Sequence, residues 1–243
     1  MTFALAVLIG MSLGALGSGG SIVTTPVLVY FAHVAPHTAI GMSLAIVGAT
    51  SLAGSLWQHR QGNVHPKALL LIGLAGSAGA FAGSGYTHLV SPRTLMLIFA
   101  AILLAVSATM FGGGAGRLRP GQCRPVRCLS AGFGAGLLTG FLGVGGGFLL
   151  VPVLVVVAGL DVRKAAGTSL AIISLNSLAG LAGHLRYVDM NWKLVAGFLA
   201  FSLAGMGLGL AAARRLPDAA LRKVFATLLA GTGIAVAGVN LFR

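Results

Sequence analysis

The sequence predicts an all-α, polytopic membrane protein made of two inverted repeats, each with a broken or re-entrant first helix pair and three transmembrane helices. The first observation is composition, because 57% of the 243 residues are hydrophobic and only 8% are charged, whereas soluble domains carry about 25% charged residues. The second is that apolar residues form continuous runs without alternation, which favours helices over a membrane barrel. The third is a pattern of glycine, proline and basic residues that occurs twice. These features exclude a soluble enzyme, a disordered chain and a disulfide scaffold.

The two halves of the chain match at an offset of 126 residues (152 − 26 = 126). The match keeps its register through proline, arginine and lysine without a gap, which chance similarity between apolar helices would not do. It pairs Gly14 with Gly140, Pro26 with Pro152, Arg60 with Arg186, Lys67 with Lys193 and Phe99 with Phe225. We therefore divide the chain into repeat 1 (residues 1–111), a linker (112–128) and repeat 2 (129–243).

Each repeat contains two short apolar segments followed by three longer ones. In chain order they cover 2–16, 21–32, 38–57, 68–89 and 94–111, then 129–142, 147–158, 165–185, 194–212 and 224–242. The first segment is too short to span, because its length at about 1.5 Å per residue is about 22 Å against a hydrocarbon core of about 30 Å. Each short pair is therefore either one long broken helix that crosses or a re-entrant hairpin that returns.

The positions of the basic residues decide between these two topologies. The chain carries 16 Lys and Arg against three Asp, a net charge of +13. With the four-arginine linker placed in the cytoplasm, crossing segments leave 9 basic residues inside and 7 outside, whereas re-entrant segments leave 12 and 4. The positive-inside rule favours the re-entrant model. Each half then has three full spans, so the copies are inverted and both termini face outward.

The remaining polar composition excludes several partners. Because the basic residues fall in short loops, we interpret them as topology signals and expect no nucleic-acid partner. Cys123 and Cys128 form a C-x4-C pair in the linker, a weak metal signal, and we interpret both as reduced thiols facing the cytoplasm. No nucleophile arrangement, metal cluster or carboxylate pair is visible, so we predict no catalytic residue, cofactor or metal, and an enzyme is least favoured.

Two glycine-rich tips separate the short helices of each copy. A helix that begins after such a tip presents unpaired N–H groups and a positive dipole end, which attract an anion. Pro26 and Pro152 are expected near the first turn of these helices, where a missing N–H matters least. The alternative is that glycine only permits close helix packing, which fits Gly73, Gly76, Gly79, Gly83, Gly205 and Gly209 well. The candidate substrate-binding tips are Gly17, Ser18, Gly19, Gly20 and Ser21, and Gly143, Val144, Gly145, Gly146 and Gly147.

A stripe of polar side chains follows each hairpin on the next predicted helix. Such groups either line a path or hold helices together, and both readings stay open. No aspartate falls inside a predicted span, which argues against a proton relay or a Na⁺ cage and favours an anionic substrate. The candidate residues on these stripes are Ser43 and Thr50 in the first copy, and Thr168, Ser169, Asn176 and His184 in the second.

With these motifs the chain resembles the TauE/SafE family of sulfite exporters, over nearly its whole length. The resemblance implies export or exchange of sulfite and small organosulfur anions, such as sulfoacetate, across the bacterial inner membrane. The copies differ where Ser21 matches Gly147 and Trp57-Gln58 matches Gly183-His184, which leaves the substrate and the symmetry of the site open. The motifs are Gly14-x-x-Gly17-x-Gly19-Gly20 with Thr25-Pro26, Gly140-x-x-Gly143-x-Gly145-Gly146-Gly147 with Val151-Pro152, Gly167-Thr168-Ser169-Leu170, and the Gly183-His184 helix end.

The sequence therefore predicts a secondary transporter that holds a small anion between two tips at the membrane midplane. Inverted repeats with broken helices are a recurring transporter plan, in which one repeat rocks against the other. An anion channel with the same site and a non-transporting membrane assembly subunit are the alternatives. The expected partners are a small anionic substrate and the lipid bilayer, and a homodimer is left open.

Overall fold

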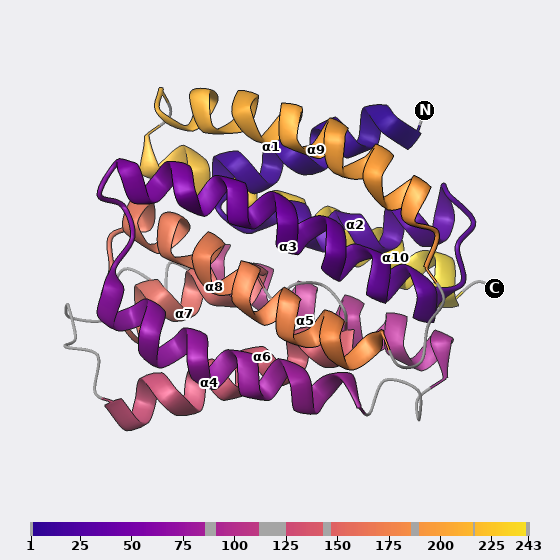
Figure 1. The fold of residues 1–243 in the computed structure, drawn as a ribbon, viewed down its shortest axis with the longest axis horizontal. Coiled ribbons are helices and arrows are strands. Elements are labelled where there is room, and N and C mark those ends of the chain that lie inside the picture. The colour runs from indigo at the N-terminus through magenta and orange to yellow at the C-terminus, as the bar shows by residue number, and fades with distance from the viewer. Residues whose placement is uncertain are drawn as a thin grey trace.

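The computed structural model describes residues 2–85, 91–111, 125–142, 147–185, 190–215 and 217–241. Every regular element in these ranges is an α-helix (Figure 1). The bounds follow the predicted apolar segments closely, because a helix satisfies its own backbone hydrogen bonds in an apolar environment. In chain order the helices are α1 (Thr2–Leu16), α2 (Gly19–Tyr30), α3 (Pro36–Arg60), α4 (Pro66–Ser84), α5 (Pro92–Phe111), α6 (Pro125–Leu142), α7 (Gly147–Val156), α8 (Val162–His184), α9 (Trp192–Ala213) and α10 (Asp218–Leu241).

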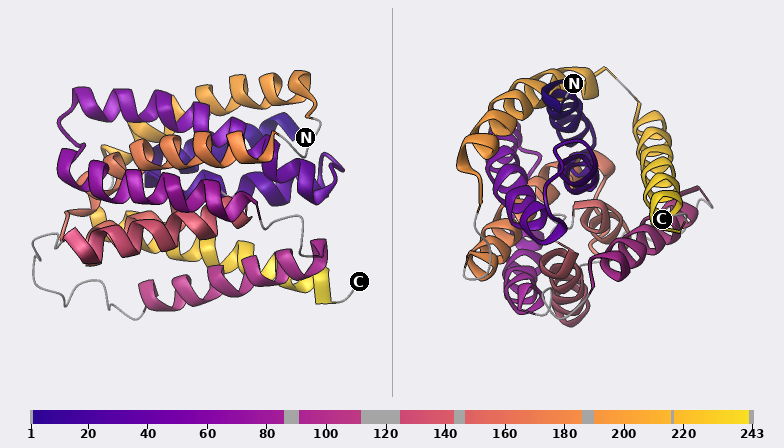
Figure 2. Two further views of the ribbon diagram at one scale, coloured as in Figure 1. Left: turned by 60° about the horizontal axis from the view of Figure 1, so that its bottom comes forward. Right: turned by 90° about the vertical axis from the view of Figure 1, so that its right-hand side faces the viewer.

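The all-helical, polytopic fold class is confirmed. Within the described ranges, four helices are long and apolar enough to cross a membrane, namely α3, α4, α8 and α9. Shorter apolar stretches occupy Ala4–Leu16, Met96–Ala108 and Ala226–Asn240, in α1, α5 and α10. Figure 2 shows α5 and α10 side by side along one edge of the bundle, where they pack on each other.

The predicted linker is shorter than expected. Helix α6 begins at Pro125, so residues 125–128 belong to its first turn, and residues 112–124 lie outside the described residues. Cys128 is buried and disulfide-bonded, so the expectation of a reduced thiol at this position is wrong. Cys123 lies outside the described residues.

Helices α1 and α2 form a hairpin that returns to its starting end. A Cβ atom added to Gly20 would overlap the Ile9 carbonyl oxygen and lie 2.7 Å from the Leu13 Cβ, so α2 folds back along α1. A helix that continued across the membrane would place Gly20 about 16 Å from Ile9, at about 1.5 Å per residue. The chain turns at Gly17, whose φ of 70° is in the left-handed region that glycine enters without steric cost.

Helix α7 likewise returns to the end of the bundle where α6 begins. Leu154 and Ala158, in and just after α7, share a buried cluster with Cys128 in the first turn of α6. The first hairpin opens at the opposite end, where the amide of Asn240 near the end of α10 donates a hydrogen bond of 2.6 Å to the Tyr30 hydroxyl. The two hairpins therefore enter the bundle from opposite ends (Figure 1).

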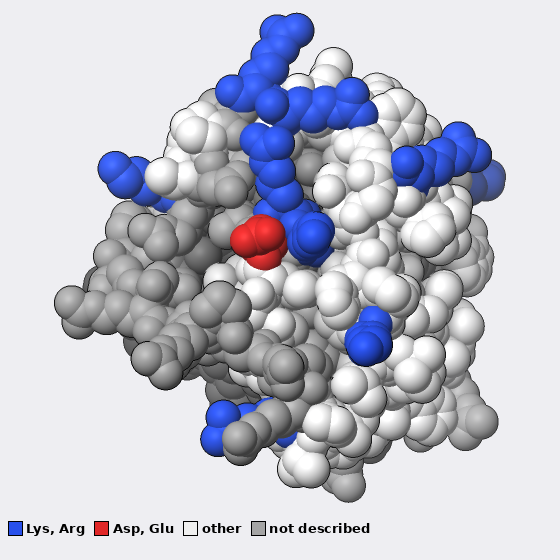
Figure 3. All heavy atoms as spheres, turned by 90° about the vertical axis from the view of Figure 1, so that its left-hand side faces the viewer, with Lys and Arg blue, Asp and Glu red and all other residues white. Residues whose placement is uncertain are grey.

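Most of the described basic residues gather at one end of the bundle (Figure 3). Gly167 lies against the backbone of Asn63, which brings the start of α8 beside the end of α3. The Arg214 guanidinium lies over the Trp57 ring, which brings the end of α9 to the same place. Among the described residues, the opposite end carries Arg93 and Lys193. We call the first the basic end; its described members are Arg60, Lys67, Arg127, Arg163, Lys164, Arg214, Arg215 and Lys223.

Glycines join helices of different repeats at very close range. Helix α6 packs parallel to α4, and α9 packs parallel to α1. A Cβ atom on Gly136 would overlap the carbonyl oxygen of Gly76, and one on Gly205 would overlap that of Val7. The packing role expected for Gly76, Gly79, Gly83, Gly205 and Gly209 is confirmed, whereas a Cβ on Gly73 would make only ordinary contacts from 3.4 Å outward.

Candidate functional site

The centre of the bundle is an antiparallel pair of repeat-related helices, α3 and α8. The space at Gly48 is bounded by Ser177, and the space at Gly180 by Leu44, so the residue numbers on the two helices run in opposite senses. If the two repeats are inverted copies, their equivalent helices must run in opposite directions, as α3 and α8 do. The pair buries most of the polar side chains that the sequence singled out, and all of those discussed below are less than 4% exposed.

The first glycine tip is clamped onto α8. The Ser169 hydroxyl lies 2.7 Å from the Gly17 carbonyl oxygen and 2.8 Å from that of Ala166, to either of which it donates. A Cβ on Gly17 would stand 2.5 Å from the Ala166 carbonyl oxygen, so only glycine allows this approach. Ser18 is buried at the N-cap of α2 and makes no side-chain cap hydrogen bond. The structure thus joins the first predicted tip to the second predicted stripe.

The N-terminus of α2 lies inside the protein. Helix α2 begins at Gly19, and Gly20 is buried against α1. The first N–H groups of a helix have no partner within it, so this end carries a partial positive charge. The side chain of Ser21 lies outside the described residues.

The second tip falls largely outside the described residues. The residues of this tip that lie outside the described ranges are Gly143, Val144, Gly145 and Gly146. Helix α7 begins at the next residue, Gly147. Helices α2 and α7, which follow the two tips, contact each other. That both tips meet at one anion therefore stays a prediction.

Pro26 lies deeper in its helix than predicted, and Pro152, which follows the start of α7 at the predicted distance, is already past the first turn. Pro26 is the eighth residue of α2 and Pro152 the sixth of α7, so both are inside a helix and not in its first turn. The expectation was wrong for α2 because the backbone becomes helical at Gly19, two residues before the predicted start. An internal proline leaves the carbonyl four residues earlier without its helical partner.

Several residues of the predicted stripes make structural hydrogen bonds. The Thr50 hydroxyl donates to the Ile46 carbonyl of its own helix at 2.7 Å. The Thr168 hydroxyl accepts from the His65 backbone N–H at 2.9 Å and ties α8 to the loop before α4. Nδ1 of His184 lies 3.0 Å from the Gly180 carbonyl oxygen. For Thr50 and Thr168 we therefore favour a structural role in holding the protein together over a role in lining a substrate path.

Other polar atoms in this centre are buried without a partner. Asn176 rests on Gly76 of α4, and its Oδ1 accepts a 3.4 Å hydrogen bond from Ser77, but its Nδ2 has no partner. A buried polar group without a hydrogen bond costs about 1–3 kcal/mol, so native proteins rarely keep one without a reason. Within the described part of the chain, the other such side-chain atoms include the hydroxyls of Ser43, Ser51 and Ser177 and Nε2 of His184.

Two of these residues, Ser51 and Ser177, were missed by the sequence reasoning. The repeat offset could have found them, because it pairs one with the other (51 + 126 = 177). The same offset pairs Ser43 with Ser169 (43 + 126 = 169). Ser169 bonds the first tip at Gly17, and the counterpart of Gly17 is Gly143 in the second tip. Ser43 is therefore the residue that the repeat assigns to the second tip.

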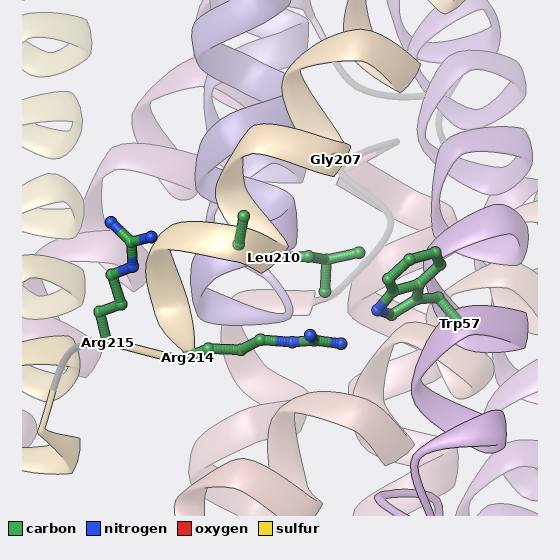
Figure 4. Close-up of a pocket in the computed structure, with 6 residues that line it drawn as sticks. Trp57, Gly207, Leu210, Arg214 and Arg215 are labelled. Carbon is green, nitrogen blue, oxygen red and sulfur yellow. The ribbon is translucent and has the colours of Figure 1, made fainter.

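A separate cavity of about 360 Å³ lies at the basic end between α3 and α9. Figure 4 shows Arg214 reaching from the end of α9 toward Trp57 on α3. The guanidinium carbon is 5.6 Å from the ring centroid. The contact between Trp57 and Arg214 joins residues 157 positions apart (214 − 57 = 157), so it could not be predicted from the local sequence.

Comparisons with known proteins agree with the fold. The family model described as sulfite exporter TauE/SafE matches residues 2–236. A "probable membrane transporter protein" of Xylella fastidiosa (strain Temecula1) is 32% identical over 94% of this chain and 91% of its own. The "probable membrane transporter protein YdhB" of Bacillus subtilis is 27% identical over 88% of this chain and 90% of its own. "Sulfite exporter TauE/SafE family protein 5" of Arabidopsis thaliana is 28% identical over 42% of this chain and 23% of its own. No solved structure matches the chain.

Proposed function

The chain belongs to the sulfite exporter TauE/SafE family, and from this premise we propose that it is a secondary transporter that exports or exchanges small anions, namely sulfite or an organosulfonate such as sulfoacetate. Its family and its apolar helices make it a multi-pass membrane protein of a transporter family. The finer proposal adds the substrate class, the site and the mechanism.

The observation that carries the proposal is the set of unpartnered polar atoms on the central helices α3 and α8. Ser43 and Asn176 are both fully buried, and each keeps a hydrogen-bond donor without an acceptor. Donors without acceptors suit an anion, which accepts hydrogen bonds through its oxygens. In a dry interior such bonds are worth more than in water, because the local dielectric constant is low.

We assign the residues to three roles. The backbone N–H groups at the start of α2, and those of the second tip at residues 143–147, cradle the anion oxygens. The Ser43 hydroxyl and the Asn176 amide donate further hydrogen bonds from the central helices. Ser169 positions the first tip through the Gly17 carbonyl and does not itself need to touch the anion.

The orientation follows from the charge distribution. The basic end faces the cytoplasm of a bacterial inner membrane, together with the linker, and both termini lie outside. Repeats 1–111 and 129–243 are then inverted copies. The opposite entry of the two hairpins and the antiparallel α3 and α8 support this assignment.

The packing suggests a moving unit other than a whole repeat. The glycine-lined contacts, α1 with α9 and α4 with α6, each join helices of different repeats. Close-packed interfaces resist sliding, because every contact would have to be remade. We propose that these mixed pairs move as units, so that alternating access opens between the pairs.

Flux through proteoliposomes tests the proposal. We expect the purified protein to take up ³⁵S-labelled sulfite with saturation, and unlabelled sulfite or sulfoacetate inside the vesicles to accelerate uptake by exchange. Gly19→Leu should abolish uptake, because the side chain would block the approach to the α2 N-terminus. Gly231→Leu is the matched control, since a Cβ there meets no atom within 4 Å. Flux that never saturates would indicate a channel, and equal flux in Gly19→Leu and wild type would refute the site.

A further inference from the structure

We propose that the cavity between α3 and α9 at the basic end binds the phosphate headgroup of an anionic phospholipid. The cavity has a volume of about 360 Å³ and is lined by Trp57, Gly207, Leu210, Ala211, Arg214 and Arg215. It therefore combines the Arg214 guanidinium and the Trp57 indole with a small apolar wall, whereas the Arg215 side chain extends away from Trp57 on the other side of α9 (Figure 4). This site is separate from the glycine tips and does not depend on the proposed transport.

The cationic side of the cavity is organised in advance. Arg214 lies over the Trp57 ring at 5.6 Å, within the range of a cation–π interaction. The Gln61 side-chain oxygen, in the amide orientation that satisfies both neighbours, accepts hydrogen bonds from the Trp57 indole and the Arg214 guanidinium. In the described part of the chain, neither Arg214 nor Arg215 has an acidic partner. Guanidinium donors are thus available to a phosphate, which they bind in a fork geometry.

The surroundings favour a lipid over a free anion. The surface next to the cavity is apolar and open: Leu56 of α3 is 60% exposed, Leu208 of α9 is 58% exposed, and a Cβ on Gly207 would meet no atom within 4 Å. Both helices are long and apolar enough to span a membrane, so this surface faces the acyl chains. Trp57 is at the end of its span and half-exposed, as tryptophans at a headgroup layer are. Charge at the headgroup level above an apolar surface is the pattern that a phospholipid complements.

The cavity belongs to one end of the molecule only. At the repeat offset, Trp57 corresponds to Gly183 (57 + 126 = 183), Arg214 to His88 (214 − 126 = 88) and Arg215 to Leu89 (215 − 126 = 89). The aromatic and cationic residues are therefore absent from the equivalent positions of the other copy. Anionic lipids of the inner leaflet attract basic residues near the membrane surface, so the site matches the end that carries the excess of arginine and lysine.

Lipid titration of the full-length protein tests the proposal. The purified protein in detergent micelles is titrated with phosphatidylglycerol, and adducts are counted by native mass spectrometry while the melting temperature is followed. Parallel titrations use inorganic phosphate and phosphatidylcholine. We expect saturable binding of phosphatidylglycerol with a rise in melting temperature, because a ligand that binds the native state stabilises it.

The variants locate the binding. Arg214→Gln should weaken phosphatidylglycerol binding about tenfold, the usual contribution of a direct hydrogen bond between a protein group and a charged group. Lys67→Gln removes one charge from the same end but does not line the cavity, so its affinity should match wild type. Unchanged affinity in Arg214→Gln, or an equal loss in Lys67→Gln, would overturn the proposal. So would inorganic phosphate that binds as tightly as phosphatidylglycerol and displaces it.

Discussion

Gly17→Ala tests the clamp between the first tip and α8. Two costs act at this position. A residue with a Cβ at a φ of 70° loses about 1–2 kcal/mol relative to its preferred conformations. The new Cβ would also lie 2.5 Å from the Ala166 carbonyl oxygen and 2.6 Å from its Cα, and overpacking of this kind costs about 1–3 kcal/mol. The reduced entropy of the unfolded chain returns about 0.4–1 kcal/mol, so the net loss is about 1–4.6 kcal/mol.

Gly62→Ala separates the two costs. Gly62 has a φ of 72° but nothing within 4 Å of its Cβ position, so it carries the conformational cost alone. For a chain of this size, each 1 kcal/mol lowers the melting temperature by about 2–4 °C. In detergent-solubilised protein we expect Gly17→Ala to melt about 2–18 °C below wild type and Gly62→Ala only about 0–6 °C below it. Sulfite uptake should fall in Gly17→Ala alone, because the tip must move away from Ser169. Equal melting temperatures of the two variants would refute the close approach of Gly17 to α8.

Three further substitutions test the rest of the structure. Ser169→Ala removes the hydroxyl bound to Gly17, so unfolding free energy should fall by about 1 kcal/mol, measured by thermal denaturation, together with sulfite uptake. Ser43→Ala removes a hydroxyl without a protein partner, so stability should be unchanged or higher while sulfite binding weakens; a stability loss equal to that of Ser169→Ala would contradict this assignment. Gly136→Ala should destabilise the protein because its Cβ would overlap α4, whereas Gly134→Ala, which meets nothing within 4 Å, should stabilise the helix by up to about 1 kcal/mol. Similar melting curves for these two glycine variants would argue against the close packing of α4 and α6.

The helices were predictable because the local sequence, through its apolar composition and segment length, determines where a membrane helix forms. Continuous apolar runs and a length threshold gave nearly all bounds of α1–α10. The return of α2 along α1 was predictable because charge reports topology independently of packing. The position of Pro26 was not, since the first helical residue after Ser18 depends on how the tip packs, and glycine has no strong preference of its own.

The contacts of the site were less predictable than its residues. The sequence identified Gly17 and Ser169 as candidates, but their hydrogen bond joins positions 152 apart. Nothing local distinguishes Thr50, which bonds its own helix, from Ser43, which keeps an unpartnered hydroxyl. Only the packing of α3 against its neighbours decides which polar group finds an acceptor. The repeat offset is the one sequence feature that does help to predict contacts. It relates a residue in one copy to a residue in an equivalent position of the other copy.

The cross-repeat pairing of α1 with α9 also has a consequence for biogenesis. Val7 lies against Gly205, which the ribosome adds 198 residues later (205 − 7 = 198). At a synthesis rate of about 5–20 residues per second, this delay is about 10–40 s. During that interval α1 is packed against α2 but lacks α9, its partner from the second repeat, and the hairpin is too short to span the bilayer. We therefore expect the nascent first hairpin to stay bound to the insertion machinery, or to lie at the membrane surface, until the second half of the polypeptide has been synthesised.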